Sequence, residues 1–169
     1  MQSRLPEKCD LYQLSEKGAD IAGTWPVAKM PRLLSMLGSE SGQAHAEMHF
    51  AKSGRNRYVK GHITAAVEIQ CQRCMDIMTL QIDTEFSLGL VETEAQIDKL
   101  PEGFEPLITE GRHFLPDVIE DELILAVPIV PVHESECSDF MNTQKEEQKV
   151  NQVVEEEKSN PFAVLKDML

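Results

Sequence analysis

Three stretches of the chain alternate apolar and polar residues with a period of two. Apolar side chains, with Thr84 as the exception, take every second position across residues 44–50, 63–69 and 78–90. This period is typical of β-strands that bury one face, and short connections between such strands favour antiparallel pairing. The turn-forming run Ser53-Gly54-Arg55-Asn56 separates the first two stretches. The pattern therefore predicts an antiparallel β-meander with one buried and one exposed face.

Two other segments carry the signals of helices. Pro31 precedes and Gly38 follows a short apolar run, which predicts a helix over residues 31–37. The apolar residues of 115–127 share one broad stripe that ends at Pro128, so a second helix is expected there. Its N-terminal half is acidic, which the helix dipole favours, and a structural role is preferred over a catalytic carboxylate pair for these residues: Asp117, Glu120, Asp121 and Glu122.

The expected fold class is α+β, an antiparallel β-meander of about four to six strands packed by a C-terminal helix and a short N-terminal helix. Residues 21–27 and 104–108 are candidate additional strands, the second within an expected loop over 92–113. Residues 1–137 are predicted to form a single α+β domain, and the mostly polar residues 138–159 a flexible linker. Residues 160–169 are predicted to be a C-terminal docking motif, for the chain's own domain or for a partner, with these candidate partner-binding residues: Asn160, Pro161, Phe162 and Leu165.

Composition places the chain among folded proteins that do not enter membranes. Hydrophobic residues make up 41% and charged residues 27%, so an ordinary core can form. No apolar stretch reaches the ~18 residues that a membrane helix needs. The first ten residues contain no apolar leader segment. With only four cysteines, a cytoplasmic and reduced location is expected.

Charge is unevenly distributed along the chain. The net charge of −13 argues against general binding to nucleic-acid phosphates. Residues 1–60 hold 9 basic and 6 acidic residues, whereas residues 61–137 hold 3 basic and 16 acidic ones. This asymmetry indicates two faces with different partners, the acidic face being suited to a basic protein. A dense basic cluster is either a solvated hairpin tip or an RNA contact, with these candidate RNA-binding residues: Lys52, Arg55, Arg57, Tyr58 and Lys60.

The cysteines provide the candidate metal site. Cys71-Gln-Arg-Cys74 lies between two predicted strands rather than at a helix N-terminus, so it lacks the dipole that lowers thiol pKa values in redox sites. Such a turn is typical of a zinc knuckle, and His133 and Cys137 would complete four tetrahedral ligands with no open catalytic position. Metal-free thiols and redox chemistry are the competing interpretations. Cys9 joins none of these groups.

Four motifs occur along the chain in this order: Glu68-Ile-Gln-Cys71-Gln-Arg-Cys74, Leu100-Pro-Glu-Gly-Phe-Glu-Pro106, Glu120-Asp-Glu-Leu-Ile-Leu-Ala-Val-Pro128-Ile-Val-Pro131-Val-His133 and Asn160-Pro-Phe-Ala-Val-Leu165. Together they resemble the YceD family, the bacterial large ribosomal RNA subunit accumulation proteins. They cover well over half of the chain, and the first and third together are specific. The family has no agreed catalytic residues to carry over.

The resemblance implies a non-enzymatic ribosome-biogenesis factor that supports synthesis, processing or stability of large-subunit (23S) rRNA. Its expected partner is that rRNA or a basic ribosomal or rRNA-handling protein, with no small-molecule substrate. Protein-mediated action is preferred over direct rRNA binding, because most of the chain is acidic. The alternatives from other classes are a zinc- or redox-active C-x-x-C protein and a plain protein-interaction module.

Overall fold

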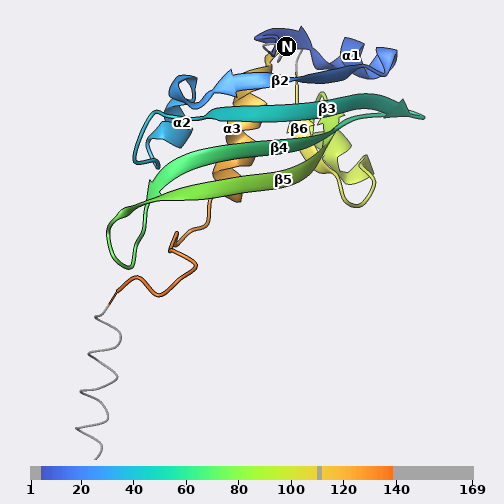
Figure 1. Cartoon of the computed structure of the whole chain (residues 1–169). Coiled ribbons are helices and arrows are strands. Elements are labelled where there is room, and N and C mark those ends of the chain that lie inside the picture. The colour runs from blue at the N-terminus through green and yellow to red at the C-terminus, as the bar shows by residue number, and fades with distance from the viewer. Residues whose placement is uncertain (1–4, 110–111, 139–169) are drawn as a thin grey trace, which may run out of the picture. The chain divides into compact units, whose positions relative to one another are not determined.

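The structure, a computed structural model, describes residues 5–109 and 112–138. The chain divides into two compact units, residues 1–132 and residues 133–169, and the fold below is that of the first unit (Figure 1). Of the predicted linker only residue 138 lies within the described ranges, and the predicted docking motif lies outside them.

Five strands form the main sheet in the order β2-β3-β4-β5-β6. Their bounds are Asp20–Pro26, Gln43–Ser53, Asn56–Gln70, Ile77–Val91 and Glu105–Ile108. The first four strands pair antiparallel in sequence order, as the period of two predicts. β6 instead pairs parallel to β5, because the intervening crossover with its 3-10 helix η2 (Glu94–Lys99) returns the chain to run in the same direction.

A small second sheet lies apart from the meander. It pairs β1 (Lys8–Asp10) antiparallel with β7 (Arg112–Phe114), two strands that the sequence pattern did not reveal. The helix α1 (Leu11–Lys17) follows β1 directly, and the Asp10 side chain accepts a hydrogen bond from the Gln13 N–H at 3.0 Å. Gly18 ends this helix in the left-handed conformation at φ 62°, which glycine adopts without steric cost.

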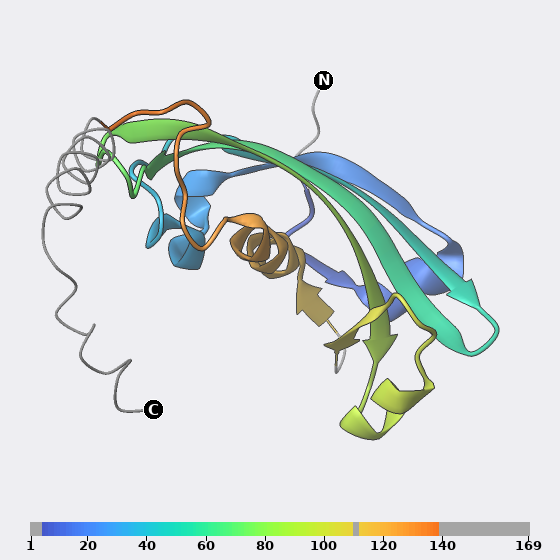
Figure 2. The same ribbon diagram turned by 90° about the horizontal axis from the view of Figure 1, so that it is seen from below.

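Both predicted helices are present. α2 (Pro31–Leu34) follows the 3-10 helix η1 (Val27–Lys29) and is shorter than predicted, whereas α3 (Leu115–Ala126) nearly matches its expected range. Figure 2 shows the sheet curving around these helices, so that they lie on its concave side. The α+β fold class is therefore confirmed. Within the described ranges, no helix is long and apolar enough to cross a membrane.

Alternation of side chains along the strands produces the core. In β3 the even-numbered residues from Ala44 to Phe50 are buried and the odd-numbered ones are more exposed. The cross-strand partners of these buried positions in β4 are odd-numbered, and they include Val59, Ile63 and Ala65. This apolar face packs on residues of α3 such as Ile119 and Leu123, leaving the polar face of the sheet on the other side.

Candidate functional site

The turn between β4 and β5 presents the two cysteines of the C-x-x-C motif. The Cys71 N–H donates to the Asp76 carbonyl at 2.9 Å, and the Met75 N–H donates to the Cys71 carbonyl at 2.9 Å. Met75 has a positive φ of 69°, a tight-turn conformation that is uncommon outside glycine. The Arg73 N–H donates to Cys71 Sγ at 3.4 Å. Backbone donors of this kind stabilise a thiolate and orient it as a metal ligand.

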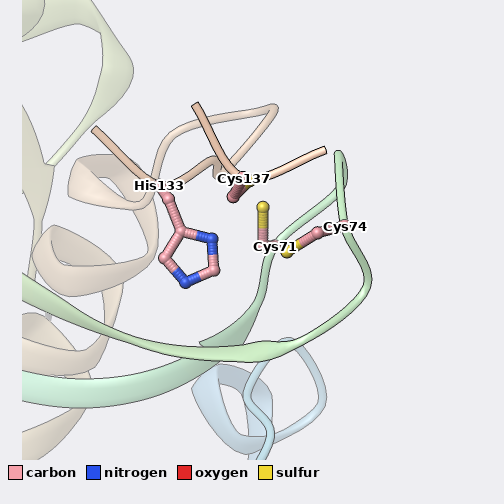
Figure 3. A group of neighbouring side chains, drawn as sticks. All are labelled: Cys71, Cys74, His133 and Cys137. Carbon is pink, nitrogen blue, oxygen red and sulfur yellow. The ribbon is translucent and has the colours of Figure 1, made fainter. Parts of the chain in front are cut away.

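The chain ahead of His133 is held against this turn. The Gln72 N–H donates to the Pro131 carbonyl at 2.8 Å, two residues before His133. Cys71, Cys74, His133 and Cys137 each offer one ligand atom, and these four atoms all lie within 4.8 Å of one another (Figure 3). The structure therefore brings together the four residues that the sequence analysis selected.

The donor set fits zinc in number and kind. Three sulfur atoms and one imidazole nitrogen are a recurrent ligand set of structural zinc sites, and tetrahedral Zn–S bonds of about 2.3 Å place ligand atoms about 3.8 Å apart. For separations of up to 4.8 Å, the ligand atoms must therefore approach one another by at most about 1 Å to coordinate an ion. No disulfide links any of the four cysteines of the chain, and the Cys71 side chain is fully buried.

The predicted RNA-binding cluster is divided between the two faces of the sheet. Lys52 and Arg57 are cross-strand partners in β3 and β4 and lie on the face toward α1, where both form salt bridges with Glu16 at 2.8 and 2.6 Å. These two cations hold the pKa of the Glu16 carboxyl below its usual value, chiefly by hydrogen bonding. Arg57 also lies over the ring of Tyr12, 4.8 Å from its centre. The positive charges of Lys52 and Arg57 are thus partly neutralised by Glu16.

Tyr58 and Lys60 alternate onto the opposite face of β4. The Tyr58 ring contacts Phe104 at 5.2 Å between ring centres, and Lys60 Nζ lies 5.5 Å from the centre of the Phe104 ring. A small cavity of about 220 Å³ opens here, lined by these three residues and by others that include Ser53 and Asn56. Phe104 was not a predicted site residue, because only the crossover to β6 brings it to β4.

Three histidines line the polar face of the sheet beside carboxylates. His49 Nδ1 lies 2.6 Å from Asp20 Oδ1, and His62 Nε2 lies 2.6 Å from Asp83 Oδ1. His45 Nε2 pairs similarly with Glu47 at 3.3 Å. The hydrogen bond to Asp83 raises the pKa of His62 above its usual value, and the neighbouring carboxylates add to this effect. The face also carries Glu68 and Glu85, which makes it acidic overall when the histidines are neutral.

One residue of the acidic cluster in α3, Glu120, links this helix to α2. Glu120 is only 3% exposed, and its carboxylate accepts hydrogen bonds from the backbone N–H groups of Arg32 and Leu33 at 2.7 and 3.0 Å. From the sequence, the helix dipole explains these acidic residues. The hydrogen bonds of Glu120 to α2 could not be predicted in this way, because residues 32 and 120 are far apart in the chain. The candidate partner-binding residues lie outside the described residues: Asn160, Pro161, Phe162 and Leu165.

Comparisons with known proteins point to one family. The family model described as large ribosomal RNA subunit accumulation protein YceD matches residues 59–169. A protein of Haemophilus influenzae with that same name is 31% identical over 170 aligned residues, which cover 98% of this chain and 96% of the relative. No solved structure matches.

Proposed function

Because the chain belongs to the YceD family of large ribosomal RNA subunit accumulation proteins, we propose that it supports accumulation of large-subunit (23S) rRNA in the cytoplasm. The proposed role is that of a non-enzymatic ribosome-biogenesis factor. The observation that carries this proposal is the alignment, over nearly the full length of both chains, with a relative that bears the accumulation-protein name. The matched family region contains the four candidate zinc ligands and the crossover between β5 and β6, whereas four of the five candidate RNA-binding residues precede it.

The acidic polar face of the sheet supports a basic protein as the partner. Carboxylates project from all four antiparallel strands, with Asp20 on β2, Glu47 on β3, Glu68 on β4 and Asp83 on β5. Such a surface attracts lysine- and arginine-rich proteins and repels RNA phosphates. A ribosomal or rRNA-handling protein has the required positive charge. Action on the rRNA is then mainly protein-mediated.

The group of four candidate ligands around the Cys71–Cys74 turn, here called the knuckle, favours a structural zinc ion in this factor. Bound by Cys71, Cys74, His133 and Cys137, Zn²⁺ would supply cross-links and no open coordination position for catalysis. A redox role is less well supported, because Cys71 is buried in a β-turn and, among the elements that the structure describes, no helix begins at this turn to activate its thiol. The thiolates would bind the metal, and the Arg73 N–H would keep the Cys71 sulfur oriented.

A gene-deletion experiment with plasmid complementation tests the proposed function. The gene for this chain is deleted in its own host, and mature 23S and 16S rRNA are measured during steady growth with and without a plasmid copy. A lower ratio of 23S to 16S rRNA that the wild-type plasmid restores is the expected result. An unchanged ratio in the deletion strain contradicts the proposal, and this readout does not depend on which surface contacts RNA.

A further inference from the structure

The cavity beside Tyr58 combines aromatic faces, a cation and small polar groups. Tyr58 and Phe104 are both half-buried, with their rings inclined at 54° to each other, so part of each ring remains accessible. Lys60 is exposed and lies within 5.5 Å of the centre of the Phe104 ring. Ser53 and Asn56 from the adjoining hairpin add groups that can exchange hydrogen bonds, and the rest of the lining is formed by Arg57, Gly89, Leu100 and Pro101.

The crossover between β5 and β6 makes this cavity and holds it in place. Leu100 packs directly over Gly89, where an added Cβ would lie 2.5 Å from Leu100 Cδ2. The absence of a side chain at Gly89 therefore lets the crossover approach β5 closely, and it brings Phe104 against Tyr58. The aromatic pair is therefore positioned by the packing of the Leu100 side chain on the backbone at Gly89.

We infer that this cavity receives one unpaired base of a single-stranded RNA, which stacks on the Tyr58 ring and meets the inclined Phe104 ring at an angle, while Lys60 neutralises the adjacent phosphate. Aromatic side chains stack on any base, and RNA recognition mostly targets unpaired bases. The volume of about 220 Å³ suits a single planar group rather than a larger ligand. The inference rests on the proposed function and adds a direct contact with RNA to it.

Charge favours RNA over a protein segment at this one place. Within the described residues, neither Lys60 nor Arg55 forms a salt bridge. Lys52 and Arg57 are both paired with Glu16, although Arg57 also lines this cavity. Lys60 lines the aromatic cavity, and Arg55 lies in the β3–β4 turn between the lining residues Ser53 and Asn56. The surrounding sheet is acidic, so the contact is limited to a base and its neighbouring phosphates. Affinity should be modest and strongly dependent on salt.

Fluorescence anisotropy of the full chain with a fluorescein-labelled single-stranded RNA 12-mer tests the inference. Tyr58→Ala should weaken binding about tenfold, and Tyr58→Phe should leave it nearly unchanged, because the ring is retained. Lys60→Ala should reduce the slope of log K against log salt by about 0.7, the value for one phosphate of a single strand. Lys52→Ala is the matched control, since it removes a similar charge from the opposite face, and it should not change the slope.

Competition experiments distinguish a base within single-stranded RNA from a base in a duplex or in a free nucleotide. Unlabelled single strand should displace the probe, while a duplex of the same sequence and free AMP or UMP should not do so at equal concentration. Displacement by the free nucleotides at that concentration would overturn the assignment to RNA. Thermal unfolding of each variant shows whether it folds, and Phe104→Leu serves as a second variant that keeps the loop packed without an aromatic ring.

The outcomes distinguish this inference from the proposed function. If deletion lowers 23S rRNA but wild type and Tyr58→Ala bind the 12-mer alike, the cavity does not bind RNA and the proposed function stands. If the folded Tyr58→Ala chain fails to restore 23S rRNA although wild type does not bind the 12-mer, the cavity binds a protein side chain and the inference is overturned. Weaker binding together with incomplete restoration supports it.

Discussion

The carboxylate of Glu120 in α3 accepts hydrogen bonds from both the backbone N–H and the guanidinium of Arg32 in α2. One carboxylate oxygen accepts the Arg32 N–H at 2.7 Å, and the other accepts Nε and Nη2 of the guanidinium at 3.1 and 3.0 Å. The same Oε1 also accepts the Leu33 N–H. A buried carboxylate of α3 thereby satisfies the free N–H groups at the start of α2, a helix of four residues with no side-chain cap of its own.

Glu120→Gln should lower the free energy of unfolding by about 2–4 kcal/mol, because it removes a buried charge that several donors share. Urea denaturation followed by circular dichroism measures the change. Asp121→Asn is the matched control. Asp121 also pairs with Arg32, but its side chain is 55% exposed, so the expected loss is below about 1 kcal/mol. Equal losses in the two variants would contradict the structural role of Glu120.

Protein purified under reducing conditions without chelators should contain one zinc ion per chain, as measured by inductively coupled plasma mass spectrometry. Cys74→Ser should lose the metal and lower Tm by roughly 5–15 °C, because a structural zinc site contributes several kcal/mol and each kcal/mol shifts Tm by roughly 2–4 °C. Cys9→Ser should keep both metal and Tm, since Cys9 lies outside the ligand group. Full metal content in Cys74→Ser would exclude the knuckle as the site.

His62 should titrate above pH 6.5, because its hydrogen bond to Asp83 stabilises the protonated ring. A pKa raised by folding means that the stabilisation is fully present below the unfolded value of 6.5 and disappears as the pH rises through the folded value. NMR titration of the ring protons measures the pKa. Asp83→Asn should lower it, whereas Asp20→Asn, which removes the partner of His49, should leave His62 nearly unchanged. If the pKa of His62 is the same in Asp83→Asn as in wild type, Asp83 is not what raises it.

Gly61→Ala should destabilise the sheet by about 1–3 kcal/mol, since an added methyl group overpacks the site. A Cβ at this position would lie 2.3 Å from Cζ of the Phe86 ring on the neighbouring strand. Phe86→Leu in the same chain should recover part of the loss, and a double-mutant cycle of unfolding free energies measures this coupling. If the two losses are simply additive, the ring is not what restricts residue 61.

Local patterns predicted the parts of this protein that local physics determines. The period of two in residues 44–90 revealed the meander, because one buried face imposes alternation on every strand. The position of Cys71 and Cys74 between two such strands identified the knuckle turn. β1 and β7 escaped prediction, since three residues are too few to show a period. The parallel pairing of β6 escaped it as well, because a crossover leaves no local signal.

The α+β class, the meander and the four candidate zinc ligands could be predicted from the sequence, since they depend on the periodicity and chemical type of residues. The contacts of the basic cluster could not be predicted in this way, because they depend on strand pairing. Pairing places Lys52 and Arg57 on the side of Glu16, and it places Tyr58 and Lys60 on the side of Phe104. Neighbouring residues of a strand point to opposite faces, so what each one meets depends on segments far away in the chain.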